Sequence, residues 1–84
     1  MVLLDKRAVK ELSALPIDVQ ARWHRAALPA LEQDPFMGRP GLDVRPWRGD
    51  VPGIDFRVRF GRGRAYYRVD APARVVRVAR FILK

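Results

Sequence analysis

The chain has 84 residues, with 17 Lys and Arg against 9 Asp and Glu and a formal charge of +8. It contains no cysteine and one histidine, which excludes disulfides, thiolate metal sites, cysteine nucleophiles and multi-histidine zinc sites. No apolar segment approaches the roughly 20 residues of a membrane span, and 49% hydrophobic with 31% charged residues is typical of a globular chain. We therefore expect one cytoplasmic domain over residues 1–84, with no metal, no small-molecule cofactor and no membrane partner.

The excess charge lies entirely in the second half of the chain. Residues 1–43 contain six basic and six acidic side chains, whereas residues 44–84 contain eleven basic and three acidic ones. Fourteen of the 17 cations are arginine, whose planar guanidinium matches the geometry of phosphate. This separation predicts a polyanion-binding surface carried by a roughly neutral scaffold.

The neutral half predicts a short strand followed by two helices. The apolar run at residues 2–4 indicates the strand, and Asp5 is a candidate N-cap for a helix from Arg7 to about Leu15 that Pro16 ends. Asp18 is a candidate N-cap for a second helix over residues 19–33, which Pro29 should kink or end a turn early. The short connection at residues 15–18 predicts an antiparallel helix hairpin.

After a turn-rich linker at residues 34–41, the apolar period changes from about 3.6 to 2. This period predicts an edge strand at residues 44–47, limited by Pro46, and strands at residues 55–60, 64–69 and 75–83. Turns are expected at residues 50–53, 61–63 and 70–73. The order β-α-α-β-β-β, with that extra edge strand, predicts an α+β fold: an antiparallel sheet of about four strands with the N-terminal helix hairpin packed on one face.

Strand alternation divides the predicted sheet into a covered face and an open face. Apolar Phe56, Val58 and Phe60 should lie under the helices, so Arg57 and Arg59 should project from the open face. In the next strand the same alternation puts three further side chains on the open face: Arg64, Tyr66 and Arg68. Arg80 interrupts the pattern of the last strand, whose faces remain unassigned.

Arginines that share one sheet face suit two kinds of chemistry. Guanidinium groups bind phosphate bidentately, and they stabilise the charge that develops when an RNA 2′-hydroxyl attacks its own phosphodiester. Exposed strand faces also carry arginine simply for solubility and edge protection, and the residues alone leave both interpretations open.

The chain resembles the RelE/ParE superfamily of type II toxins over nearly its whole length. The segments that carry the resemblance are Ala8-Val9-Lys10-Glu11-Leu12 with Leu15-Pro16, residues 31–35, Trp47-Arg48-Gly49, Phe56-Arg57-Val58-Arg59-Phe60-Gly61 and Arg64-Ala65-Tyr66-Tyr67-Arg68-Val69. The resemblance implies a RelE-like toxin that cuts mRNA in the ribosomal A site without a metal, or a ParE-like toxin that poisons DNA gyrase. It also implies neutralisation by a small acidic antitoxin.

The resemblance further implies roles for individual residues. Arg57, Arg59 and Arg64 match basic positions that hold the scissile phosphate, and Lys84 matches a basic position at the end of the last strand. RelE-like nucleases often place a Tyr or His beyond that position, but this sequence ends at Lys84, so Tyr66 is the nearest substitute as the proton-transfer group. A gyrase poison and a degenerate RNA- or antitoxin-binding member therefore remain alternatives. The expected RNA-binding residues are Arg45, Arg48, Arg62, Arg68 and Arg80.

Five other residues have simpler interpretations. We expect Trp23 and Trp47 to pack in the core or at an edge, and Tyr67 to be buried with its hydroxyl bonded to backbone. His24 should be a partly exposed helix residue away from the arginines, and Asp55 should pair with a nearby arginine.

Overall fold

The computed structural model describes residues 1–49 and 53–84, so most of the turn expected at 50–53 lies outside the described residues. The observed elements, in chain order, are β1 (Val2–Leu4), α1 (Lys6–Ala14), α2 (Ile17–Arg22), the π-helical segment η1 (Trp23–Ala27), α3 (Leu28–Gln33), β2 (Leu42–Pro46), β3 (Phe56–Phe60), β4 (Gly63–Asp70) and β5 (Val75–Leu83). The predicted α+β class is confirmed. Among the described residues, no helix is long and apolar enough to cross a membrane.

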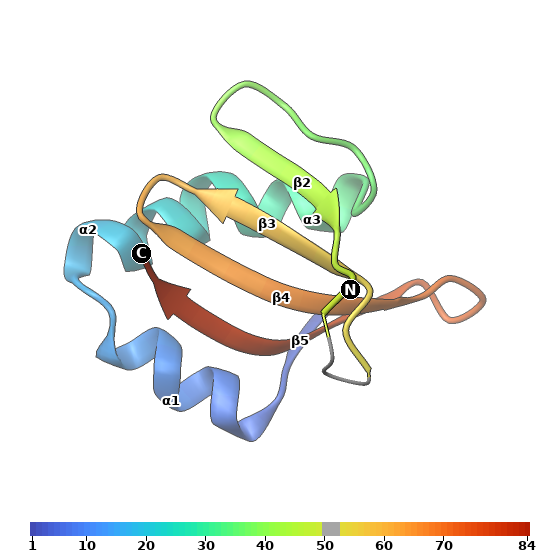
Figure 1. The fold of residues 1–84 in the computed structure, drawn as a ribbon, viewed down its shortest axis with the longest axis horizontal. Coiled ribbons are helices and arrows are strands. Elements are labelled where there is room, and N and C mark those ends of the chain that lie inside the picture. Colours follow the sequence, from blue (N-terminus) through green and yellow to red (C-terminus); the bar gives the residue numbers. More distant parts are fainter. Residues whose placement is uncertain (50–52) are drawn as a thin grey trace.

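The sheet has five strands in the order β1-β5-β4-β3-β2, where about four were expected. β1 pairs in parallel with β5, and all other neighbours are antiparallel. The edge strand expected at residues 44–47 is observed as β2, Leu42–Pro46, so it begins two residues earlier. It ends at Pro46, which cannot donate to a ladder. The helices from α2 to α3 lie behind the sheet in Figure 1, and α1 runs along β5.

The second helix continues past Pro29, so the expected early end is wrong. A wider turn precedes the proline, because the Leu28 N–H bonds the Trp23 carbonyl five residues earlier. In an α-helical turn the Pro29 ring would press on the carbonyl of Arg25, and the π-helical turn relieves this clash. Asp5 stands at the N-cap of α1 as expected, although its side chain caps no backbone N–H. The N-cap expected at Asp18 is wrong, because Pro16 precedes the second helix and Asp18 lies in its first turn.

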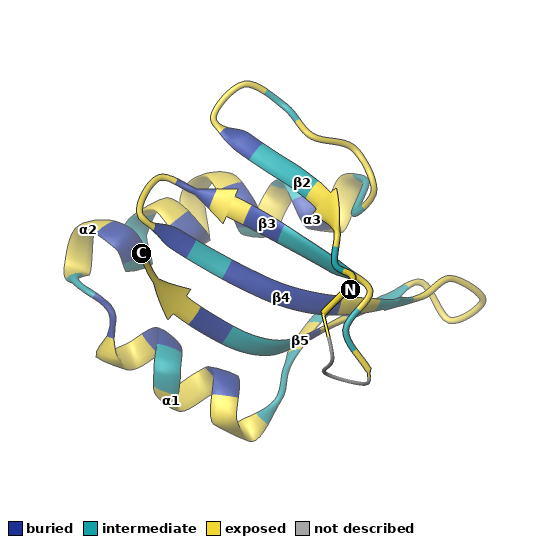
Figure 2. Ribbon diagram, viewed as in Figure 1, coloured by how far each residue is buried: buried dark blue, intermediate teal, exposed yellow. Residues whose placement is uncertain are grey.

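The hydrophobic core lies between the helices and the covered face of the sheet. Trp23 is 1% exposed and its ring packs edge-on against Phe81 at 4.7 Å between centroids and tilted against Phe60 at 5.5 Å. Figure 2 shows the buried positions along β4 at the centre of the sheet and exposed residues on the outer turns of the helices. The expected core role of Trp23 is confirmed.

A β-bulge explains why the pattern of β5 was ambiguous. Tyr66 pairs with Arg80 but Tyr67 pairs with Val78, which leaves Ala79 as the extra residue. The bulge lets Val78 and Phe81, three positions apart, both enter the core. Arg80 consequently pairs with an open-face residue rather than interrupting the core.

Candidate functional site

The register of the sheet brings the predicted open-face residues together. On the adjacent strands β3 and β4, Arg57 lies opposite Tyr66, and Arg59 lies opposite Arg64. On the outer strands, Arg45 of β2 is paired with Arg57 and Arg80 of β5 is paired with Tyr66. Arginines from four strands therefore flank one tyrosine across this face.

Asp43 holds the arginines at the β2 side of the open face. Its carboxylate accepts hydrogen bonds from Arg45 Nε at 3.0 Å and from Arg57 Nη2 at 3.3 Å. These bonds, that from Arg45 most of all, keep the pKa of Asp43 below its usual value, and burial opposes them only partly. The Arg57 side chain is 13% exposed, so its charge is largely committed to this pair.

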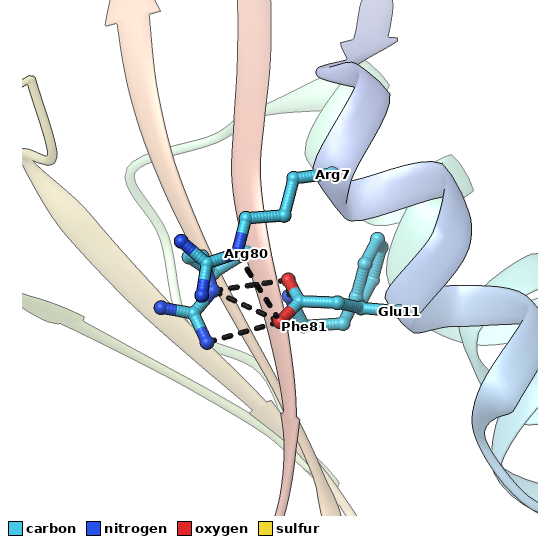
Figure 3. A network of polar contacts seen from close by, with 4 residues as sticks. All are labelled: Arg7, Glu11, Arg80 and Phe81. Atoms are coloured by element: carbon cyan, nitrogen blue, oxygen red, sulfur yellow. Dashed lines mark hydrogen bonds and ion pairs between the residues drawn. The ribbon is translucent and has the colours of Figure 1, made fainter.

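Glu11 of α1 holds Arg80 at the opposite side of the sheet, as Figure 3 shows. Its carboxylate accepts from Arg80 Nε and Nη2, each at 3.0 Å, and from the backbone N–H of Phe81 at 3.1 Å. β1 pairs with β5 only as far as Val78, so the edge beyond it has no neighbouring strand. The Glu11 carboxylate takes the place of a strand carbonyl there and ties α1 to the sheet.

Arg59 and Arg64 differ from these paired arginines. Among the described residues, neither has a carboxylate within 4.0 Å, although they face each other across β3 and β4. Arg64 Nε is also buried without a hydrogen-bond partner. Asp43 lies opposite Arg59 in the register, but its carboxylate is bonded to Arg45 and Arg57. Two adjacent cations without an ion-pair partner of their own repel each other, and a bound anion would reduce that repulsion. This pair is the best candidate for binding a phosphate.

Tyr66 lies on the open face, but it is only 7% exposed. The indole ring of Trp47 covers it in an edge-on contact, with 4.9 Å between centroids, which confirms the packing role expected for Trp47. Both rings line a cavity of about 370 Å³ together with Arg7 and Arg80. This cavity is a route by which a ligand could reach the Tyr66 side chain.

The remaining predicted site residues lie apart from this cluster or at its margins. Arg68 and Arg48 are exposed, the first on β4 and the second just after β2. Arg62 turns toward the helices and pairs with Asp18 of α2 at 3.3 Å. Lys84 is exposed at the end of β5, and its backbone N–H bonds the Arg62 carbonyl. Ile82 lies opposite Arg64 in the register, so Lys84 follows two residues beyond that position, whereas the Arg62 side chain is bonded to α2.

The structure also tests three side interpretations. Tyr67 is buried and its hydroxyl donates to the Pro35 carbonyl at 2.6 Å, as expected. His24 is exposed in η1, also as expected. Among the described residues, no arginine pairs with Asp55 as was expected. Asp55 lies just before β3, and its carboxylate instead accepts a hydrogen bond from the Val69 N–H of β4 at 3.4 Å.

Asp43 and Glu11, the two carboxylates that bind arginines of the open face, are not among the site residues predicted from the sequence. The position of Asp43 could have been predicted from the sequence, because it precedes Arg45 by two residues and residues two apart in a strand share a face. The pairing of Glu11 could not have been predicted in this way, because its partner is 69 residues away. Within the described residues, no group of three or more His, Cys, Asp and Glu side chains forms a metal site.

No family model matches the chain, and no curated protein matches its sequence. Its structure matches the RelBE2 toxin–antitoxin complex of Mycobacterium tuberculosis with a TM-score of 0.79 and 25% identity, over 99% of this chain and 95% of that one. It matches the RelE–RelB complex of Pyrococcus horikoshii with a TM-score of 0.78 and 28% identity, over 98% and 91% of the two chains. A third match, at 20% identity to the RelB–RelE complex of Methanococcus jannaschii, has a TM-score of 0.69 over 96% and 88% and shows the fold alone. The chain is therefore structurally homologous to the RelE toxins of type II toxin–antitoxin systems, which supports its resemblance to the RelE-like superfamily.

Proposed function

We propose that this protein is a type II toxin that cuts mRNA on the ribosome as a metal-independent endoribonuclease of the RelE type. The observation that carries the proposal is the arginine pair on the open face. Arg59 and Arg64 are adjacent across two strands and have no carboxylate partner among the described residues, whereas Arg57 and Arg80 do. A pair of cations held on rigid strands, and not neutralised by the protein itself, is suited to a scissile phosphate.

The reaction is an attack of an RNA 2′-hydroxyl on the neighbouring phosphorus atom. The bond from phosphorus to the 5′-oxygen of the next nucleotide breaks, the 2′-oxygen loses its proton and the departing 5′-oxygen gains one, which leaves a 2′,3′-cyclic phosphate and a 5′-hydroxyl end. Negative charge builds up on the non-bridging phosphate oxygens as the pentavalent state forms. Arg59 and Arg64 would donate hydrogen bonds to those oxygens, and their stabilisation grows with that charge.

Two partners belong to this proposal. The ribosome would present the message to the open face, and a small acidic antitoxin would neutralise the toxin. The structural neighbours from Mycobacterium tuberculosis and Pyrococcus horikoshii were both solved as complexes of toxin and antitoxin. A basic open face suits an acidic partner, because opposite charge both steers and stabilises such an encounter.

Induction in cells followed by primer extension tests the nuclease. One reporter message is translated, and a matched message differs only in a mutated start codon. We expect growth to stop and new 5′ ends to occur within the translated message alone. Growth arrest without new ends in either message would contradict the nuclease, and equal cleavage of both messages would contradict ribosome dependence.

One observation favours a second candidate, a ParE-like inhibitor of DNA gyrase. The Tyr66 ring lies under Trp47, and Asp43 is held ionised by two arginines, so neither is a readily available proton-transfer group. A toxin that only binds its target needs no such group. Inhibition of supercoiling by purified gyrase would support this candidate, and normal supercoiling in excess protein would eliminate it.

A further inference from the structure

A shallow cleft of about 620 Å³ lies beside the arginine pair, where α2 approaches the edge formed by β2 and β3. Three arginines from separate elements line it: Arg22 at the end of α2, Arg39 before β2, and Arg59 on β3. Arg59 is also a member of the candidate phosphate site, so the cleft continues that site toward the helices. Neither Arg22 nor Arg39 has a role in the site described above.

Arg39 is held by a tight turn. Its backbone N–H and carbonyl both bond Leu42, at 2.9 and 2.8 Å, across Pro40 and Gly41. Gly41 has a φ of +83°, so the turn has proline second and a left-handed glycine third, which is a type II arrangement. Arg39 therefore projects from a backbone that is already fixed, which lowers the entropy cost of binding a ligand.

Arg22 lies over the turn that joins β3 to β4. A Cβ atom placed on Gly61 would be 3.2 Å from Arg22 Cδ and 3.3 Å from its Nε, so the arginine passes directly above the glycine backbone. Gly61 also has a φ of +65°, which a two-residue hairpin turn with glycine first requires. The absence of a side chain at this turn allows Arg22 to reach the same cleft as Arg59.

The three arginines of the cleft have no ion-pair partner among the described residues, which leaves them available to an external anion. Among the described residues, Arg22, Arg39 and Arg59 have no carboxylate within 4.0 Å. The acidic residue in the lining, Asp43, already accepts hydrogen bonds from Arg45 and Arg57. Three such guanidinium groups around an open cleft suit successive phosphates of one strand better than a compact, enclosed ligand.

We propose that this cleft binds backbone phosphates of the RNA strand next to the phosphate held by Arg59 and Arg64, with Arg22 and Arg39 as anchors. The inference rests on the proposed function and names the path that the RNA takes away from the reacting bond. The shared residue Arg59 favours RNA over an acidic peptide, because one strand can occupy both sites at once. Arg22 and Arg39 thereby fix the register of the substrate.

Fluorescence anisotropy with a labelled 12-nucleotide single-stranded RNA tests the proposal. Every 2′-hydroxyl of the probe is methylated, so the probe binds but cannot be cut. Arg22→Ala and Arg39→Ala should each weaken binding and reduce the slope of log affinity against log salt by about 0.7, the value for one lost phosphate contact on a single strand. Lys10→Ala removes the same charge from an exposed position of α1, and it should leave both the RNA affinity and the salt slope unchanged.

Two other results would overturn the proposal in distinguishable ways. If Arg22→Ala and Arg39→Ala bind the probe like the wild type while Arg64→Ala binds weakly, the cleft is not on the RNA path and the proposed function survives. If the two cleft variants lose binding only to a labelled Glu-rich 20-residue peptide, the occupant is an acidic protein segment. Primer extension tests the nuclease independently, because it reports cleavage rather than affinity.

Discussion

Neighbouring residues of one strand lie in different environments on the two faces of the sheet. Tyr67 stacks on Phe56 in the core and gives its hydroxyl to the Pro35 carbonyl, whereas Tyr66, one residue earlier, lies on the charged face under Trp47. The covered face contains no buried charge among the described residues. The open face contains arginines that carboxylates hold and arginines that no described carboxylate holds. Fold stability and ligand binding are thus separated by the pleat of a single sheet.

The open face itself contains two kinds of arginine, those paired with a carboxylate and those that are not. Asp43 at one side holds Arg45 and Arg57, and Glu11 at the other holds Arg80. Arg59 and Arg64 lie between these two groups. The number of arginines on the open face is therefore larger than the number available to bind phosphate. A guanidinium group paired with a carboxylate contributes to the fold, whereas an unpaired one is available to a phosphate. Of the four substitutions below, three test this division and Tyr67→Phe tests the covered face, beginning with the largest expected effect.

Arg64→Ala should separate function from stability most clearly. Loss of a donor to the developing phosphate charge should slow cleavage about a hundredfold or more, which corresponds to roughly 3 kcal/mol of transition-state stabilisation. Single-turnover cleavage of mRNA on programmed ribosomes measures the effect, and urea denaturation should show little change. Arg74→Ala, an exposed arginine in the turn between β4 and β5 that has no assigned role, is the matched control. Equal rates for the Arg64 and Arg74 variants would contradict the site.

Glu11→Gln should have the opposite signature. It leaves Arg80 without its counter-charge, so we expect about 1–3 kcal/mol of lost stability. Urea denaturation measures the loss. Glu32→Gln removes an equal charge from exposed α3 and should change stability little. If both variants were equally stable, the Glu11 bridge between α1 and β5 would contribute nothing to the fold.

Tyr67→Phe should destabilise the covered face without affecting RNA binding. Loss of the bond to Pro35 should remove about 1 kcal/mol. Burial, with Asp34 nearby, raises the pKa of Tyr67 in the folded state. The unfolded chain therefore ionises this tyrosine first, and stability present below its ordinary pKa of about 10 should fall as the pH rises above that value.

Denaturation at pH 8 and at higher pH separates the two effects. The wild type should lose stability in alkali more steeply than the phenylalanine variant. Tyr66→Phe is the control, because no described residue hydrogen-bonds the Tyr66 hydroxyl. An identical alkaline decline in wild type and Tyr67→Phe would show that the buried hydroxyl does not titrate as described.

Asp43→Asn should convert paired arginines into available ones. Without the carboxylate, Arg45 and Arg57 can reach a phosphate, so RNA affinity should rise severalfold and the salt slope should steepen by up to about 0.7 per new contact. The difference should disappear in acid, because the lowered pKa of Asp43 means that its pairing is present above its ordinary pKa and is lost as the pH falls through the folded-state value. Glu32→Gln again removes the charge elsewhere, and an equal gain from it would indicate net charge alone.

Much of this molecule could be read from local pattern. The alternation of β3 and β4 gave the correct face for Arg57, Arg59, Arg64 and Tyr66, because successive strand side chains must point to opposite sides of a sheet. The burial of Tyr67 followed from the same alternation. Helices before strands gave the α+β class. The lopsided charge gave a basic open face.

Tertiary structure decided the rest. The π-helical turn before Pro29 and the bulge at Ala79 depend on what each element packs against, and both altered expectations drawn from the period alone. The pairing of Arg80 with Glu11, 69 residues earlier, has no local signal. The cleft lined by Arg22, Arg39 and Arg59 also has no local sequence signal, because these residues come from three separate elements. Periodicity is fixed by the covalent chain, whereas the partner of a charge is fixed by which distant segments the fold places beside it.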